Sequence, residues 1–90
     1  MPVFHRQDAE ALATLVAGAL EDPGALLNHE AGSAALAALH AGIATGLPLV
    51  TVDLTPAERR ALRFCWETLA DGAATISDER FERVLGALAG

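Results

Sequence analysis

One segment near the C-terminus, "DGAATISDERF" at residues 71–81, combines a glycine, an isoleucine and several acids in the manner of a calcium-binding loop. A loop of the EF-hand kind needs oxygen ligands at positions 1, 3 and 5, glycine at position 6 and a bidentate glutamate at position 12. When Ile76 takes the usual apolar eighth position, the twelfth residue is Arg80. When Gly72 takes the sixth position, the eighth residue is Ala74. Every register loses required ligands, so the segment indicates a capped turn between two helices.

Histidine and cysteine are the other side chains of this sequence that could bind a metal ion. His29 and His40 share nearly one face of a helix, but their eleven-residue spacing corresponds to about 16 Å along the helix axis. One metal ion cannot bridge that distance. His5 lies in another segment, and Cys65 is the single cysteine. We therefore expect no metal site within one chain and no cofactor.

The sequence offers no nucleophile in an activating context. Cys65 stands beside Trp66 on an apolar stripe, which favours a buried, inert thiol. The chain contains no lysine for a Schiff base, no tyrosine general acid, and no Gly-x-Ser-x-Gly or phosphate-loop motif. We therefore expect a protein that is not an enzyme.

Three arginines form the densest basic cluster, and a second predicted helix follows them. Arg59, Arg60 and Arg63 therefore raise the alternative of a DNA-binding regulator of the helix-turn-helix type. A recognition helix meets DNA with its N-terminal residues, and here that helix would begin with Asp78 and Glu79. Acids facing phosphates make nucleic acid an unfavourable partner.

The distribution of charge favours a basic partner. The net charge is −6, and residues 1–54 account for −5 of it, with six acids against one arginine. An acidic chain repels nucleic acid and anionic membranes at long range. A second alternative is thus a small acidic inhibitor or immunity-type protein, whose expected contacts are Glu10, Glu21, Asp22 and Glu30. The lone cysteine predicts a reducing cytoplasm, and we expect no signal peptide in "MPVFHRQDAE".

Length and composition predict one helical domain spanning residues 1–90. Twenty residues are alanine, the best helix former, and only four are phenylalanine or tryptophan. We expect an all-α bundle of four helices, with a possible fifth short turn near Leu26. The first helix is expected to start with Asp8 as its N-terminal cap and to stop at Pro23.

The other helix boundaries have clearer signals. The second helix is predicted from residue 28 or 29 to Thr45, with Gly46 as its C-terminal cap. Thr55 with Glu58 three residues later predicts a capping box for the third helix, which should run to about residue 70. Arg63 lies four residues before Glu67 on this helix, within reach of a salt bridge. The helix is expected to bury an apolar stripe of Leu62, Cys65, Trp66 and Leu69. Ser77 is expected to cap the last helix.

The segment at 47–54 is either a short strand or an extended linker. Pro48 restricts a strand here to an edge or to its first residue. The sequence "PVFH" near the N-terminus is the plausible internal partner for strand pairing.

The middle of the chain, residues 31–52, contains no Asp, Glu, Lys or Arg. It approaches the length of a membrane span, but Gly46 and Pro48 interrupt it, so we expect no membrane insertion. A helix without a charged face must otherwise be enclosed by protein. We therefore predict an interaction module or small subunit that forms a homo-oligomer. The expected interface residues are Leu36, Leu39, His40, Ile43, Leu49, Val50 and Val52.

Overall fold

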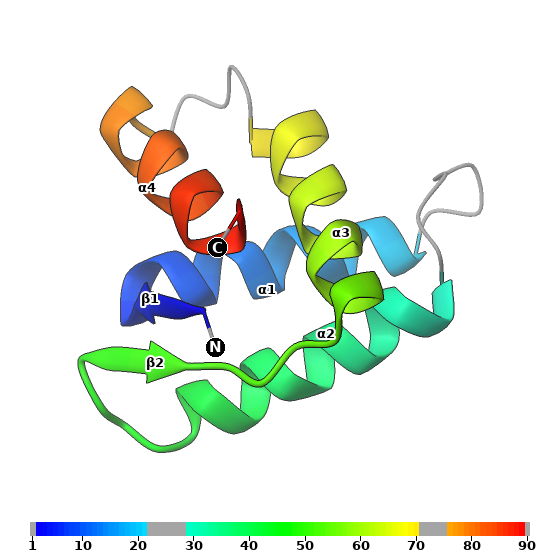
Figure 1. Cartoon of the computed structure of the whole chain (residues 1–90), viewed down its shortest axis with the longest axis horizontal. Coiled ribbons are helices and arrows are strands. Elements are labelled where there is room, and N and C mark those ends of the chain that lie inside the picture. The colour runs from blue at the N-terminus through cyan, green and yellow to red at the C-terminus, as the bar shows by residue number, and fades with distance from the viewer. Residues whose placement is uncertain (1, 22–28, 71–75, 90) are drawn as a thin grey trace.

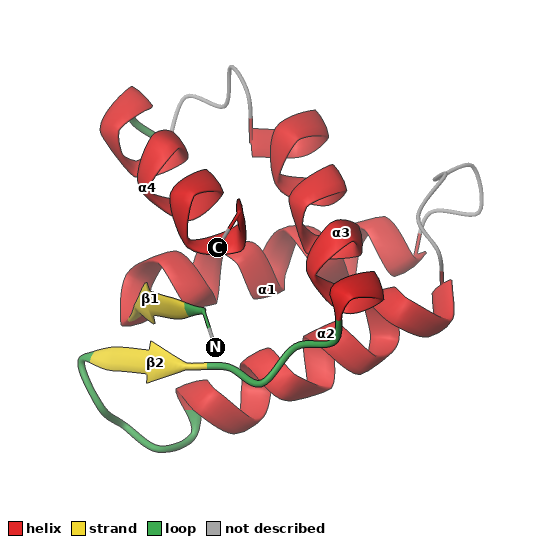
Figure 2. Ribbon diagram, in the orientation of Figure 1, coloured by secondary structure: helices red, strands yellow, loops and turns green. Residues whose placement is uncertain are grey.

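The computed structural model describes residues 2–21, 29–70 and 76–89. This part of the chain forms four helices, a π-helical turn and a two-stranded ribbon (Figures 1 and 2). The elements in order are β1 (Val3–His5), α1 (Arg6–Glu21), α2 (His29–Ile43), β2 (Leu49–Thr51), α3 (Pro56–Cys65), the turn η1 (Trp66–Ala70) and α4 (Asp78–Ala89). The predicted mainly helical architecture is confirmed, whereas the turn expected near Leu26 lies outside the described residues.

Helix α1 crosses the middle of the molecule, and the other helices pack around it (Figure 1). α2 returns beneath α1 in the opposite direction, and α3 and α4 rise above it. The β ribbon lies at the end where α1 begins and α2 ends. Among the described residues, no helix combines the length and the apolar character needed to cross a membrane.

The segment at 47–54 contains a true strand. β2 pairs antiparallel with β1, in a register that joins Val3 to Thr51, Phe4 to Val50 and His5 to Leu49. Because side chains alternate along a strand, Phe4 and Val50 point into the core while their neighbours on both strands face outward. The ribbon thus has one buried face and one solvent face.

The predicted helix caps are present. The Thr55 hydroxyl accepts a hydrogen bond from the Glu58 backbone N–H at 3.2 Å, and the Glu58 carboxylate accepts one from the Thr55 N–H at 3.0 Å. Helix α2 ends at Ile43, two residues before the predicted Thr45, and Gly46 adopts the left-handed conformation after the turn that follows, with φ of 75°. The Ser77 hydroxyl accepts a hydrogen bond from the Arg80 backbone N–H at 3.2 Å. These local signals fix where the helices start and stop.

The prediction that Asp8 caps the first helix is wrong. β1 leads directly into α1 at Arg6, whose backbone N–H donates to the Pro48 carbonyl oxygen at 3.0 Å. Asp8 therefore lies inside the first turn of α1, with its side chain only 1% exposed. Its carboxylate accepts hydrogen bonds from two arginines of α4 instead of from its own helix.

The apolar stripe predicted for the third helix is also corrected at its C-terminal end. Leu62, Cys65 and Trp66 are buried as expected, but Leu69 is 43% exposed. The reason is the π-helical turn η1, in which hydrogen bonds reach one residue further than in an α-helix and the winding shifts. Ala70 takes the inward position instead and is 2% exposed.

The core lies where all four helices meet the inner face of the ribbon. Its largest fully buried side chains are Trp66, Phe4, Leu12, Leu39, Leu62 and Leu88. Alanines complete it, including Ala9 and Ala35 with no exposed area. Small side chains let the helices approach closely, which suits the alanine-rich composition.

Candidate protein-interaction surfaces

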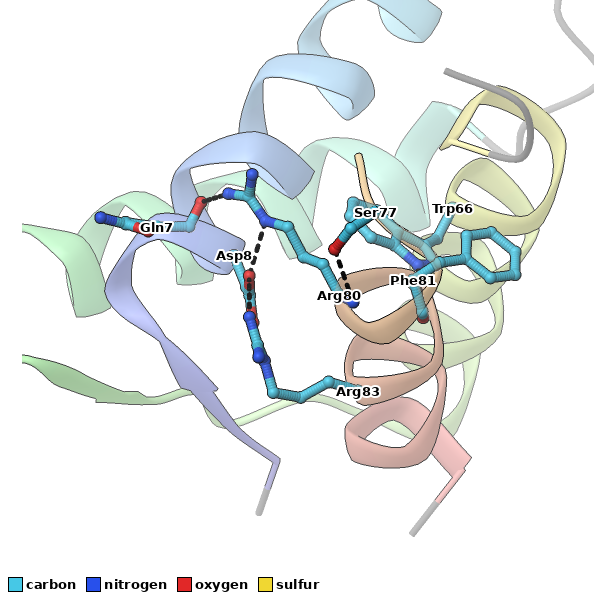
Figure 3. Close-up of polar contacts among 7 residues, drawn as sticks. All are labelled: Gln7, Asp8, Trp66, Ser77, Arg80, Phe81 and Arg83. Atoms are coloured by element: carbon cyan, nitrogen blue, oxygen red, sulfur yellow. Dashed lines mark hydrogen bonds and ion pairs between the residues drawn. The ribbon is translucent and has the colours of Figure 1, made fainter. Parts of the chain in front are cut away.

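An ion cluster of the buried Asp8 with the partly exposed Arg80 and Arg83 joins the start of α1 to α4 (Figure 3). Arg80 Nε donates to Asp8 Oδ1 at 2.8 Å. Arg83 donates twice, from Nε to Oδ2 at 2.7 Å and from Nη2 to Oδ1 at 3.0 Å. Arg80 Nη2 also donates to the Gln7 carbonyl oxygen at 2.7 Å. The carboxylate thus receives three charge-assisted hydrogen bonds.

Burial alone would raise the pKa of Asp8, but the hydrogen bonds and charges of Arg83 and Arg80 outweigh it and hold the pKa below its usual value. The hydrogen bond to Asp8 raises the pKa of Arg83 in turn. The cluster is therefore fully ionised near neutral pH. This ion cluster positions α4 against the start of α1.

A second contact fixes α4 against η1. The Trp66 indole N–H donates to the Phe81 carbonyl oxygen at 3.0 Å. The two rings stack with centroids 6.1 Å apart (Figure 3). Both contacts of α4 are directed inward, so this helix is held from two sides.

The basic residues of the expected DNA-reading unit are partly engaged within the chain. Arg80 and Arg83 of α4 point toward Asp8 (Figure 3). On α3, Arg63 Nε lies 2.9 Å from Glu67 Oε1 in the predicted salt bridge between residues four apart. Arg60 remains exposed. The exposed N-terminal turn of α4 carries Asp78 and Glu79.

The seven residues expected at an interface divide into three groups. Leu39, Val50 and Val52 are at most 1% exposed and belong to the chain's own core. Leu36 and Ile43 are half-buried and pack against that core. Only His40 and Leu49 are exposed. The structure therefore leaves two of these side chains fully accessible to a partner.

Among the residues that the structure describes, the most exposed large apolar side chains lie on the outer face of the β ribbon and in the loop just before β2. Leu49 is 53% exposed and Val3 is 48% exposed. They are diagonal neighbours, because Leu49 pairs with His5 and Val3 pairs with Thr51 on the same face. Leu47, in the loop just before β2, is 58% exposed. We call Val3, Leu47 and Leu49 the ribbon patch.

Two members of the ribbon patch were missed from the sequence. Val3 was recognised only as part of a possible partner strand, and Leu47 only as part of an extended segment. A signal was present in the sequence. Because side chains alternate along a strand, Val3 faces the opposite side from its buried neighbour Phe4. Using this signal requires knowing which of the two faces of the β ribbon packs on the core.

A groove of about 560 Å³ lies between α1 and the C-terminal end of α2. Its lining residues are Glu10, Ala13, Thr14, Ala17, Gly18 and Glu21 from α1, and His40 and Ile43 from α2. Two of these, Glu10 and Glu21, are among the acids expected to contact a basic partner. The structure thus brings part of the acidic set together along one helix face.

Opposite its buried face, α2 from Ser33 on and the turn after it present exposed residues that are small except for His40. The exposed positions are Ser33, Ala34, Ala37, His40, Ala41 and Ala44. At Gly42 a side chain would meet the ribbon, since an added Cβ would lie 2.5 Å from Val50 Cγ1 and 3.5 Å from the Thr51 carbonyl oxygen. The absence of a Cβ is what lets α2 contact β2.

Within the described ranges, no three histidine, cysteine, aspartate or glutamate side chains are arranged to hold a metal ion. Much of the calcium-like segment, residues 71–75, lies outside the described residues. Cys65 is buried, and burial raises the pKa of its thiol. A thiol in this environment is a poor nucleophile.

No protein-family model, no curated protein and no solved structure matches this chain. Its function must therefore be argued from the surfaces described above.

Proposed function

We propose that this chain is a non-enzymatic interaction module that associates with a second copy of itself through the ribbon patch. The supporting observation is the exposure of three large apolar side chains, Val3, Leu47 and Leu49, on and next to one sheet face. Burying such side chains is the main favourable term in protein association. Scattered exposed leucines need no explanation, but a cluster of them marks a contact surface.

The lack of fixed charge on the ribbon face favours a second copy as the occupant of this face. The chain carries −6 overall, so two copies repel each other over most of their surfaces. The outward residues of β1 and β2 are Val3, His5, Leu49 and Thr51. None of them is Asp, Glu, Lys or Arg, so this face can meet its own copy without bringing like fixed charges together. The patch is small, and we therefore expect weak, micromolar association.

The test is the mass of the chain in solution as a function of concentration. Sedimentation velocity from low micromolar to millimolar chain should show a shift from 9.3 kDa toward twice that mass. Leu49→Glu should keep the protein monomeric at every concentration. Leu69→Glu is the matched control, because Leu69 is 43% exposed but lies on η1, and it should associate like the unmodified chain.

Two results would contradict the proposal. One is a monomer at the highest concentration reached. The other is an equal effect of Leu49→Glu and Leu69→Glu, which would mean that added negative charge, and not the ribbon patch, controls association.

A DNA-binding function has less support. The two arginines of α4 are engaged by Asp8, and its exposed first turn is acidic. A cytoplasmic location stays a prediction that rests on the single, buried Cys65.

A further inference from the structure

The groove between α1 and α2 follows one face of α1 over about three turns. Its α1 residues stand at positions 10, 13, 14, 17, 18 and 21, a spacing that puts them on a single stripe. From Glu10 to Glu21 the stripe is about 16 Å long. His40 and Ile43 of α2 form the opposite wall near the Glu10 end. This length matches a short helical segment better than a compact small molecule.

The floor of the groove consists of small side chains. Ala13, Ala17 and Gly18 form its middle, and an added Cβ at Gly18 would have nothing within 4 Å. The distance between packed helices falls when the side chains at the contact are small. The Thr14 hydroxyl already donates to the Glu10 carbonyl oxygen at 3.0 Å. The floor thus offers close backbone approach and no unsatisfied hydroxyl donor.

The ends of the groove are acidic, and no arginine is among the described residues that line it. Glu10 stands at one end and Glu21 at the other. Arg6 pairs with Glu10 at 3.2 Å, but both side chains are about half exposed, so the pair is weak and can be exchanged for another cation. The groove is therefore electrostatically complementary to a cationic ligand.

Helix α1 of a second copy is not a cationic ligand of this kind. If α1 of another copy lay in the groove, its own Glu10 and Glu21 would meet the same two acids in either direction. Like charges placed opposite each other cost binding free energy. The groove therefore fits a helix of opposite charge better than it fits α1 of a second copy.

We propose that the α1–α2 groove binds a basic amphipathic helix of another protein. Two arginine or lysine side chains about eleven residues apart on one face of that helix would pair with Glu10 and Glu21. Small or medium apolar residues between them would pack on Ala13, Ala17 and Gly18. This surface is distinct from the ribbon patch, so the chain can bind its partner with or without self-association.

The test uses the full chain and two labelled synthetic alanine-rich peptides of identical composition. One peptide carries its two arginines eleven residues apart, and the other carries them side by side. Fluorescence anisotropy should show tighter binding of the first peptide, weakened by salt because the contacts at both ends are ionic. Equal affinity for both peptides would overturn the proposal, as would no binding of either.

Variants of the chain separate the groove from general charge effects. Glu21→Gln should weaken binding about threefold, as expected for one exposed ion pair. Gly18→Leu should weaken it more than tenfold by filling the floor. Glu82→Gln on α4 changes the net charge equally outside the groove and should have no effect. If Glu82→Gln weakens binding as much as Glu21→Gln does, the attraction is non-specific and the groove is not the site.

A final variant keeps the two proposals apart. Leu49→Glu should bind the spaced peptide with unchanged affinity, because the ribbon patch does not line the groove. Loss of peptide binding in this variant would overturn the assignment to the groove, while loss of association alone would leave it standing.

Discussion

Replacing Asp8 by asparagine should destabilise the protein more than any other single change of a carboxylate. The side chain is 1% exposed and receives three hydrogen bonds from two arginines. Asparagine keeps the shape but loses the charge and one of the two acceptor oxygens. The guanidinium groups of α4 then have no anion to pair with.

The size of the effect follows from how far the arginines are buried. Removing one partner of a buried ion pair costs about 3–5 kcal/mol when the remaining charge is trapped away from water. Here the side chains of Arg80 and Arg83 are 24% and 39% exposed, so both can turn partly toward solvent. We therefore expect Asp8→Asn to lower the free energy of unfolding by about 2–3 kcal/mol. The total free energy of unfolding of a domain of this size is roughly 5–13 kcal/mol.

Urea unfolding followed by the fluorescence of Trp66 measures this change, because Trp66 is the single tryptophan and is fully buried. With a urea dependence of about 1–3 kcal/mol per molar, the midpoint should fall by roughly 1–3 M. Asp53→Asn is the matched control, since Asp53 is exposed, and its midpoint should stay close to that of the unmodified chain.

A double-mutant cycle separates the ion cluster from a general effect of residue 8. In a chain that already carries Arg80→Gln and Arg83→Gln, Asp8→Asn should lower the free energy of unfolding clearly less than in the unmodified chain. If the two sets of changes add without coupling, or if Asp8→Asn leaves the midpoint unchanged, the argument that this cluster holds α4 in place fails.

Three further predictions concern pH, glycine and the capping box. Because the pKa of Asp8 is lower in the folded state, its contribution is present above the unfolded pKa of about 3.9 and is lost as pH falls through the folded value. The stability difference between the unmodified chain and Asp8→Asn should therefore shrink in acid; a constant difference would contradict this. Gly18→Ala should stabilise by up to about 1 kcal/mol because the site is helical and open. Gly42→Ala should instead cost about 1–3 kcal/mol by overpacking against Val50, and thermal unfolding of both variants compares the two sites. Thr55→Ala should cost about 1 kcal/mol through loss of the reciprocal capping bonds, and an unchanged melting temperature would show that the box is dispensable.

Signals that act over a few residues could be read from the sequence. The capping box at Thr55, the cap at Ser77 and the glycine after α2 all stand where they were predicted. Each depends on residues at most four apart, so the necessary partners are visible in the sequence itself. The same holds for the salt bridge between Arg63 and Glu67.

Features that depend on the tertiary arrangement could not be read in this way. Asp8 meets its arginines across 72 and 75 residues of chain, and the local pattern favoured a helix cap. The expected interface residues Leu39 and Val50 are apolar in sequence, but nothing in their spacing says that other elements of the same chain would cover them. The exposure of Leu69 follows from the π-helical turn, which no local residue pattern predicted.

The division of α1 into separate faces explains why the proposed surfaces can be tested without unfolding the protein. Leu12 and Val16 lie on the core face of α1 with no exposed area. Asp8, near the N-terminal end of α1, anchors α4. The groove stripe from Glu10 to Glu21 uses other positions of the same helix. Because an α-helix has 3.6 residues per turn, these sets interleave in sequence but point in different directions. A change at Glu21 should therefore alter partner binding at constant stability, whereas a change at Asp8 should lower stability and leave the groove acids in place.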